Sequence, residues 1–224
     1  MTDPSTASLS LLSSAIAGVV ARATPAIVSV HSHRSRASGF IWKPNIVVTA
    51  DETLADEGEI SIELSDGTVR PARIAGRDHT TDVALLRFDT QDDTKEIAPI
   101  KLSHDAPMLG SLSVVVAAER GLPAAALGTV SLVGGRWRSL RGGEIDVRVE
   151  LDVRLRHSHQ GGLVLDATGD AIGMAVLGPR RVLVIPTATI ERVAGRLETH
   201  GRIAKAISES AFSRSSSTMV SAQW

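Results

Sequence analysis

The side chains best suited to chemistry follow a strand-like segment in the second half of the chain. Residues 147–155 alternate apolar and polar side chains, which is the pattern of a strand with one buried face. The chain then passes through the polar turn Ser158-His159-Gln160-Gly161-Gly162 and resumes as a short apolar run. A serine hydroxyl with an imidazole suits nucleophilic catalysis, whereas an imidazole with carboxylates suits zinc or manganese.

Short strand-like runs on both sides must position this turn. The runs of the first half cover residues 26–33, 38–42, 45–50, 59–64, 69–75 and 82–88. Those of the second half cover residues 112–118, 126–133, 145–155, 163–165, 171–176 and 181–185. No helical pattern intervenes between neighbouring runs, so a barrel or sandwich is favoured over a parallel sheet.

Helical patterns occur only towards the two ends of the chain. An amphipathic helix is predicted over residues 10–22, and a second one from residue 187 or 188 to about residue 199, before Gly201. Residues 90–97 are predicted to form a charged linker between the halves, and residues 208–224 a Ser-rich disordered tail.

Composition excludes several classes of function. The 24 basic and 25 acidic residues nearly balance, which argues against a dedicated binder of nucleic acid or anionic membranes. With no cysteine and 43% hydrophobic residues, stability must come from a packed aliphatic core.

The apolar run at residues 9–20 lacks a basic leader and is expected to be too short to span a bilayer. Without a convincing export signal, a cytoplasmic location is favoured over a periplasmic one.

Several motifs together resemble the HtrA (Deg) family of trypsin-fold serine proteases over residues 12–206. They are Thr24-Pro25-Ala26-Ile27-Val28-Ser29-Val30, Ser38-Gly39-Phe40-Ile41, Leu64-Ser65-Asp66-Gly67, Thr81-Asp82-Val83-Ala84-Leu85-Leu86, Gly128-Thr129-Val130-Ser131, Gly161-Gly162 and Val184-Ile185-Pro186. The resemblance implies an all-β fold of two six-stranded barrels with an N-terminal and a C-terminal helix. The expected division is 1–104 for the N-terminal helix and first barrel, 105–207 for the second barrel and C-terminal helix, and 208–224 for the tail. The family usually continues into a PDZ domain, and this sequence is expected to lack one.

The resemblance also locates the positions of a catalytic triad. The family's nucleophile loop reads Gly-Asn-Ser-Gly-Gly-Pro, so Gln160 stands in the nucleophile's place and Ser158 in that of an oxyanion-loop glycine. The run Val-Thr-Ala-Asp-Glu-Thr at residues 48–53 places Glu52 where the histidine base belongs, and Asp82 keeps the orienting carboxylate. A glutamine amide provides no usable nucleophile near neutral pH, and a carboxylate next to Asp82 is a like charge, so one of the two pKa values should be raised and the pair can share a proton.

These substitutions predict a proteolytically inactive relative, a pseudoprotease, that works as a binding, scaffold or regulatory subunit. No cofactor is expected, and the partner is a protein or peptide, including an active HtrA-type relative. The resemblance further implies a homo-oligomer, a trimer mediated by the N-terminal segment. Candidate contacts are Leu11, Leu12, Ile16 and Val19 with Phe40 or Trp42.

The alternative function is a hydrolase or peptidase with a rearranged or metal-dependent site. The displaced nucleophile would be Ser158 or Ser38 with His157 or His159 as base, although neighbours on one turn point apart. The metal ligands would be Glu52, Asp82 and His159, against the simpler interpretation of solvated loop histidines.

Three further features of the sequence have simple structural interpretations. His31 and His33 share a strand face but are interpreted as exposed residues and not as a metal clip. The arginines within residues 136–156 alternate with acidic residues, which favours a solvated barrel face over a nucleic-acid stripe. Trp224 could present an apolar carboxyl end to a PDZ-type groove, although a plain tail is the simpler interpretation.

Overall fold

The first half of the chain closes into a barrel of six antiparallel strands. A computed structural model describes residues 4–33, 35–89 and 100–200. The strands are β1 (Ile27–Ser32), β2 (Ser35–Lys43), β3 (Ile46–Ala50), β4 (Ile60–Glu63), β5 (Val69–Asp78) and β6 (Val83–Phe88), paired in the order β1-β2-β3-β6-β5-β4. Closure leaves no free sheet edge, and inward aliphatic side chains such as Val30, Ile62 and Leu86 fill the interior.

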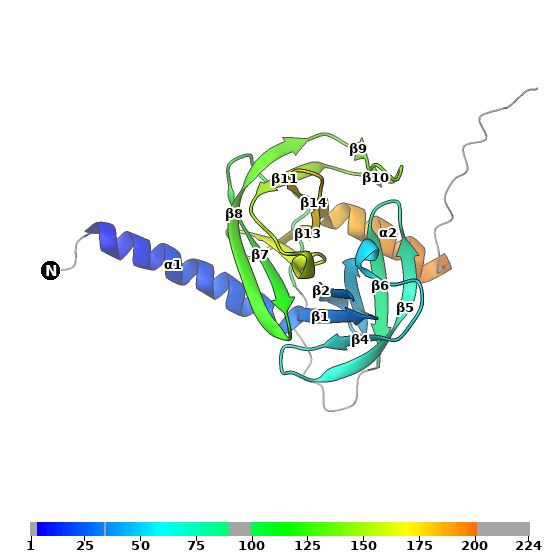
Figure 1. The fold of residues 1–224 in the computed structure, drawn as a ribbon. Coiled ribbons are helices and arrows are strands. Elements are labelled where there is room, and N and C mark those ends of the chain that lie inside the picture. The colour runs from blue at the N-terminus through cyan, green and yellow to red at the C-terminus, as the bar shows by residue number, and fades with distance from the viewer. Residues whose placement is uncertain (1–3, 34, 90–99, 201–224) are drawn as a thin grey trace, which may run out of the picture.

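The second half forms another closed barrel. Its strands are β7 (Leu112–Glu119), β8 (Leu122–Gly134), β11 (Arg148–Asp152), β12 (Leu163–Asp166), β13 (Ala171–Leu177) and β14 (Val182–Pro186), in the order β11-β14-β13-β12-β7-β8. Between β8 and β11 the chain leaves the barrel as a two-stranded arm, β9 (Trp137–Arg138) with β10 (Glu144–Ile145). The all-β double barrel with a helix at each end is therefore confirmed (Figure 1).

One apolar cluster joins the two barrels and both helices. Phe40 and Leu85 from the first barrel pack in the same buried cluster as Leu163 and Met174 from the second. Helix α2 (Thr187–His200) contacts strands of both barrels through a stripe at helical spacing, Ile190, Val193, Ala194 and Leu197, which is buried as the sequence predicts. The barrels are thus held in a fixed relation, and their facing ends form the site described below.

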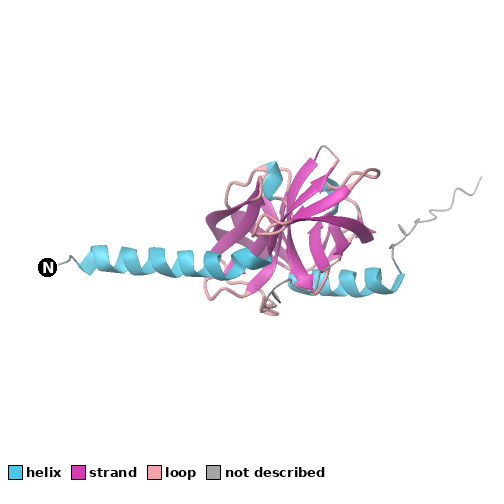
Figure 2. Cartoon of the chain, turned by 90° about the horizontal axis from the view of Figure 1, so that it is seen from below, coloured by secondary structure: helices cyan, strands magenta, loops and turns pink. Residues whose placement is uncertain are grey.

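Helix α1 (Pro4–Ala23) projects from the barrels for most of its length (Figures 1 and 2). It begins well before the predicted residue 10, and only its last turns are anchored, with Val19 and Ala23 buried beside β7. The segment Thr6–Ala26 is long and apolar enough, by length and composition alone, to cross a membrane, which corrects the expectation that it is too short. A signal sequence or a buried core helix meets the same criterion.

Two sequence expectations need correction at the level of the fold. The strand predicted over residues 145–155 is divided, because the chain turns out of the arm at Ile145 before it re-enters the barrel at Arg148. Of the candidate trimer contacts, Val19 and Phe40 are 4% and 1% exposed inside this chain's own core, so neither can contact another copy. The predicted linker at residues 90–97 and tail at residues 208–224, including Trp224, lie outside the described residues.

Candidate active-site cleft

Strand pairing brings Glu52 and Asp82 together at one end of the first barrel. The 3₁₀ turn η2 (Asp51–Thr53) follows β3, and Asp82 immediately precedes β6, whose Val83 pairs with Ala50. The backbone N–H of Glu52 donates to Asp82 Oδ1 at 2.7 Å. Asp82 adopts a left-handed backbone conformation (φ 60°), which aspartate tolerates better than most residues other than glycine.

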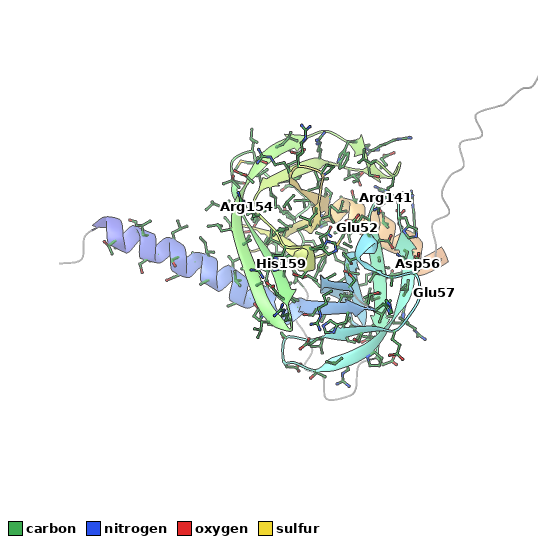
Figure 3. All side chains as sticks on the ribbon, in the orientation of Figure 1. Glu52, Asp56, Glu57, Arg141, Arg154 and His159 are labelled. Carbon is green, nitrogen blue, oxygen red and sulfur yellow. The ribbon has the colours of Figure 1, made fainter. Side chains whose placement is uncertain are left out.

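An arginine from the second barrel completes this cluster. Arg141 lies between β9 and β10, and its Nη2 donates to Glu52 Oε2 at 2.8 Å, while its Nη1 lies 3.9 Å from Asp82 Oδ1 (Figure 3). Glu52, predicted to occupy the position of the histidine base, therefore has its carboxylate paired with a guanidinium. No hydrogen bond links the two carboxyl groups within the described part of the chain. The structure thus gives no support to a shared proton.

Burial raises the pKa of Asp82 to about 7. The hydrogen bond from the Glu52 backbone N–H opposes that rise, the Glu52 carboxylate adds to it, and Arg141 opposes it again. The prediction that one of these two carboxyl groups has a raised pKa is confirmed. The main cause is loss of hydration, however, and the like charge of Glu52 contributes less.

Gln160 does not join Glu52 and Asp82. Its side chain is fully buried, its Oε1 accepts the Leu177 backbone N–H at 3.1 Å, and its Nε2 lies 2.9 Å from His157 Nδ1. It makes no hydrogen bond to either carboxyl group within the described residues and does not line the cleft. The residue predicted at the nucleophile's position therefore makes its contacts away from the cleft, with His157 and Leu177.

The backbone of the same turn is occupied by its own hydrogen bonds. Residues His157–His159 form a 3₁₀ turn, η3, in which the Gln160 N–H donates to the His157 carbonyl at 3.2 Å. An oxyanion hole requires backbone N–H groups that point at the substrate. Here the N–H of Gln160 points back into the turn, so it cannot stabilise an oxyanion.

The residues predicted for a displaced nucleophile or a metal site make structural contacts instead. Ser38 Oγ is buried, donates to the Ser158 carbonyl at 2.8 Å and accepts the Ala118 N–H at 2.9 Å. His159 Nε2 lies 3.3 Å from Glu119 Oε2, and Figure 3 shows it apart from Glu52. Among the described residues no group of three or more histidine or acidic side chains could hold a metal, which corrects the metal site drawn from Glu52, Asp82 and His159.

The two histidines on the first strand also separate. His31 Nε2 lies 3.4 Å from Glu63 Oε2 on the neighbouring strand β4. His33 follows the end of β1 with a left-handed backbone (φ 50°) and packs against Gly58. The change of backbone direction after Ser32 removes the shared strand face, so no two-histidine clip forms here.

A cleft with a volume of about 950 Å³ lies between the barrels, beside Glu52 and Asp82. Thr80 and Thr81 line it from the first barrel, and the β9–β10 arm and the β13–β14 turn line it from the second. The arm is fixed across the cleft because Ser139 Oγ donates to the Thr80 carbonyl at 2.5 Å. At its base, Asp146 accepts hydrogen bonds from Thr189 and Arg192.

A buried ion pair behind the cleft escaped the sequence analysis. Asp51, which is fully buried, accepts from Arg77 Nε at 2.5 Å and also faces His79. The Arg77 guanidinium also pairs with Asp56, with Nη1 3.0 Å from Oδ1. The only sequence signal was an acidic residue directly after a buried strand. Arg141 was missed as well, because its alternation with acidic neighbours is typical of a solvated face.

Comparison with known proteins agrees with this architecture. Residues 37–174 match the family described as Trypsin-like peptidase domain, which is more than half of the chain. The chain therefore belongs to the trypsin-like peptidase family. The structure superposes on the crystal structure of Deg5 with a TM-score of 0.75 and 22% identity, over 85% of this chain and 97% of that one. It also superposes on the serine endoprotease from Yersinia pestis with a TM-score of 0.69 and 22% identity, over 82% of this chain and 66% of that one.

Sequence relatives identify the HtrA group within that family. A "Probable periplasmic serine endoprotease DegP-like" of Rhizobium meliloti (strain 1021) is 24% identical over 181 residues, covering 77% of this chain and 35% of that protein. "Protease Do-like 1, chloroplastic" of Arabidopsis thaliana is 25% identical over 182 residues, covering 76% of this chain and 41% of that protein. The chain spans well under half the length of these relatives. It is an HtrA-type trypsin-fold domain.

Proposed function

We propose that this HtrA-type domain is proteolytically inactive and works as a binding, scaffold or regulatory subunit. The observation that carries the proposal is Gln160. It stands in the nucleophile's place, is fully buried, and uses both ends of its amide for contacts inside the second barrel. An amide in this state neither attacks a carbonyl nor passes a proton to a leaving amine.

The other two triad positions support the same conclusion. Glu52 is held by Arg141 at 2.8 Å, and so is not free to act as a base towards any hydroxyl. Asp82 makes no contact with an imidazole within the described residues and instead accepts the Glu52 backbone N–H. With the Gln160 N–H turned into its own loop, the residual catalysis that an oxyanion hole alone supplies, about 10³- to 10⁴-fold over water, is lost as well.

Activity-based labelling tests the proposal directly. Purified protein is treated with a fluorophosphonate probe, and separately with casein in the presence of divalent metals or EDTA. We expect no covalent label and no cleavage in any condition, with trypsin as the positive control. Labelling of any serine, or cleavage that EDTA abolishes, would instead establish a hydrolase with a rearranged or metal-dependent site.

A reconstructed triad shows whether inactivity comes from the missing side chains alone or also from the altered turn. The variant Glu52→His/Gln160→Ser restores the residue types of an active site on this backbone. We expect it to remain unlabelled, because the residue 160 N–H is bonded to the His157 carbonyl. Labelling of this variant would show that the turn opens and that the side chains alone account for the loss of activity.

We propose that the subunit assembles through the projecting part of α1, with further copies or with an active HtrA-type relative. Leu9, Leu11 and Leu12 are 69%, 72% and 47% exposed on this helix. Exposed apolar side chains on a projecting helix commonly mark an interaction surface. Light scattering should give a mass above that of one chain, and the variant Leu9→Ser/Leu12→Ser should reduce it. A monodisperse monomer at micromolar concentration would refute the assembly.

A further inference from the structure

The cleft between the barrels combines an apolar floor with a rim of arginines. The floor comes mainly from the second barrel and its arm and consists of Trp137, Ile145, Val176, Leu183 and Ile185. The rim consists of Arg138, Arg141, Arg148, Arg180 and Arg181. A concave surface with an apolar base and a few charged groups is typical of a ligand site in which the apolar part supplies affinity and the charges supply specificity.

The acidic residues of the cleft are already neutralised. Glu52 pairs with Arg141 at 2.8 Å, and Glu150 pairs with Arg148 at 2.5 Å. Asp82 is close to the same Arg141 at 3.9 Å. These carboxylates consequently offer no counter-charge to the remaining arginines of the rim.

Arg181 pairs with Asp152 at 2.8 Å, which leaves Arg138 and Arg180 as the remaining cations of the rim. Both side chains are exposed, and neither forms an ion pair with any residue in the described part of the chain. Arg138 belongs to β9 of the arm, and Arg180 to the turn between β13 and β14, so two separate elements direct positive charge at one apolar floor. Cleft walls of one sign concentrate ligands of the opposite sign.

We propose that this cleft binds an extended peptide segment in which aliphatic residues are flanked by aspartate or glutamate. The aliphatic side chains lie on the floor, and the acidic side chains meet Arg138 and Arg180. This proposal rests on the proposed binding function, since the bound segment is held and not cut. A phosphate-rich ligand is disfavoured, because nucleic acid needs a wide array of unpaired cations and this rim has two over an apolar base.

The placement of the ligand's acidic residues follows from charges outside the lining. Asp56 and Glu57 are exposed on the loop after η2, on the β5 side of Glu52 and away from Arg141 (Figure 3). Asp56 is paired with Arg77 at 3.0 Å, so the negative charge of Glu57 is the one that opposes an acidic residue extending over the first barrel. The acidic residues of the ligand therefore lie over the second barrel, where both free arginines are located.

Fluorescence anisotropy with two matched peptides tests this proposal. The probes are fluorescein-labelled Gly-Ser-Asp-Glu-Val-Ile-Asp-Glu-Gly-Ser and its neutral counterpart Gly-Ser-Asn-Gln-Val-Ile-Asn-Gln-Gly-Ser. In wild type the acidic peptide should bind about five- to tenfold more tightly than the neutral one, as two exposed ion pairs allow. The variant Arg138→Gln/Arg180→Gln should weaken binding of the acidic peptide by the same factor and leave the neutral peptide unchanged.

A matched control removes two arginines elsewhere. Arg73 and Arg87 are exposed cross-strand partners on the outer face of the first barrel, away from the cleft. The variant Arg73→Gln/Arg87→Gln carries the same change in net charge and should leave the dissociation constant of the acidic peptide within about twofold. An equal loss in this control would attribute the preference to net charge and overturn the cleft proposal.

The remaining outcomes separate this inference from the proposed function. Equal dissociation constants for the two peptides, or an unchanged constant in Arg138→Gln/Arg180→Gln, would overturn the inference and leave the absence of catalysis untouched. Mass spectrometry of the same samples detects cleavage. A peptide that binds with the acidic preference and is also cut would support the cleft's specificity while refuting the inactive subunit.

Discussion

Replacing Asp82 by asparagine should stabilise the protein, and increasingly so as the pH rises. Asparagine keeps an oxygen that can accept the Glu52 N–H, so the hydrogen bond at 2.7 Å can persist. It also removes a carboxyl group that is costly to ionise in the folded protein. The substitution therefore isolates the electrostatic cost of burying Asp82 beside Glu52.

The magnitude follows from the shift in pKa. Burial raises the pKa of Asp82 from 3.8 to about 7, which corresponds to about 4 kcal/mol when the group is ionised in both states. A raised carboxyl pKa gives stability that is fully present below pH 3.8 and is lost as the pH rises through about 7. The gain in free energy of unfolding from Asp82→Asn should therefore be near zero below pH 3.8. It should grow by about 2.5 kcal/mol between about pH 5 and about pH 8.

Urea denaturation of wild type and Asp82→Asn across this range measures the difference. Asp66→Asn is the matched control, because hydrogen bonds from the Thr68 backbone and side chain lower the pKa of the exposed Asp66. The Asp66 carboxylate contributes stability that is present above pH 3.8 and is lost as the pH falls through the lowered pKa. Asp66→Asn should therefore be slightly destabilising at about pH 8. A difference for Asp82→Asn that is independent of pH, or a loss of stability at about pH 8, would refute the reasoning.

Two further substitutions test the supports of the cleft. Arg77→Ala leaves the fully buried Asp51 without its guanidinium partner. The free energy of unfolding, measured by denaturation, should fall by about 3–5 kcal/mol. The double variant Asp51→Asn/Arg77→Met removes both charges and should recover part of that loss. Gly143→Ala places a methyl group against the Thr80 carbonyl and should displace the β9–β10 arm, lowering stability and raising the dissociation constant of the acidic peptide. Gly135→Ala meets open space and should change neither quantity; equal effects of the two alanines would contradict this account of the arm.

The local pattern of the sequence determined most of the strands and the helix at the C-terminal end, whereas the two barrels were implied by the family resemblance. Alternation of apolar and polar residues places strands wherever one face is buried, and that pattern is visible residue by residue. The spacing of Ile190, Val193, Ala194 and Leu197 marks the packed face of α2 in the same way. The residue types at positions 52, 82 and 160 were equally readable, so the absence of a serine and a histidine there needed no coordinates.

The tertiary structure alone decided what those positions do. Gln160 is turned away from the cleft, where its Oε1 accepts the N–H of Leu177, a contact that exists only because β13 lies beside the turn. Arg141, 89 residues from Glu52 along the chain, reached that carboxylate because the arm crosses from one barrel to the other. Long-range contacts of this kind depend on how the barrels pack, and no periodicity within a short stretch of sequence records them.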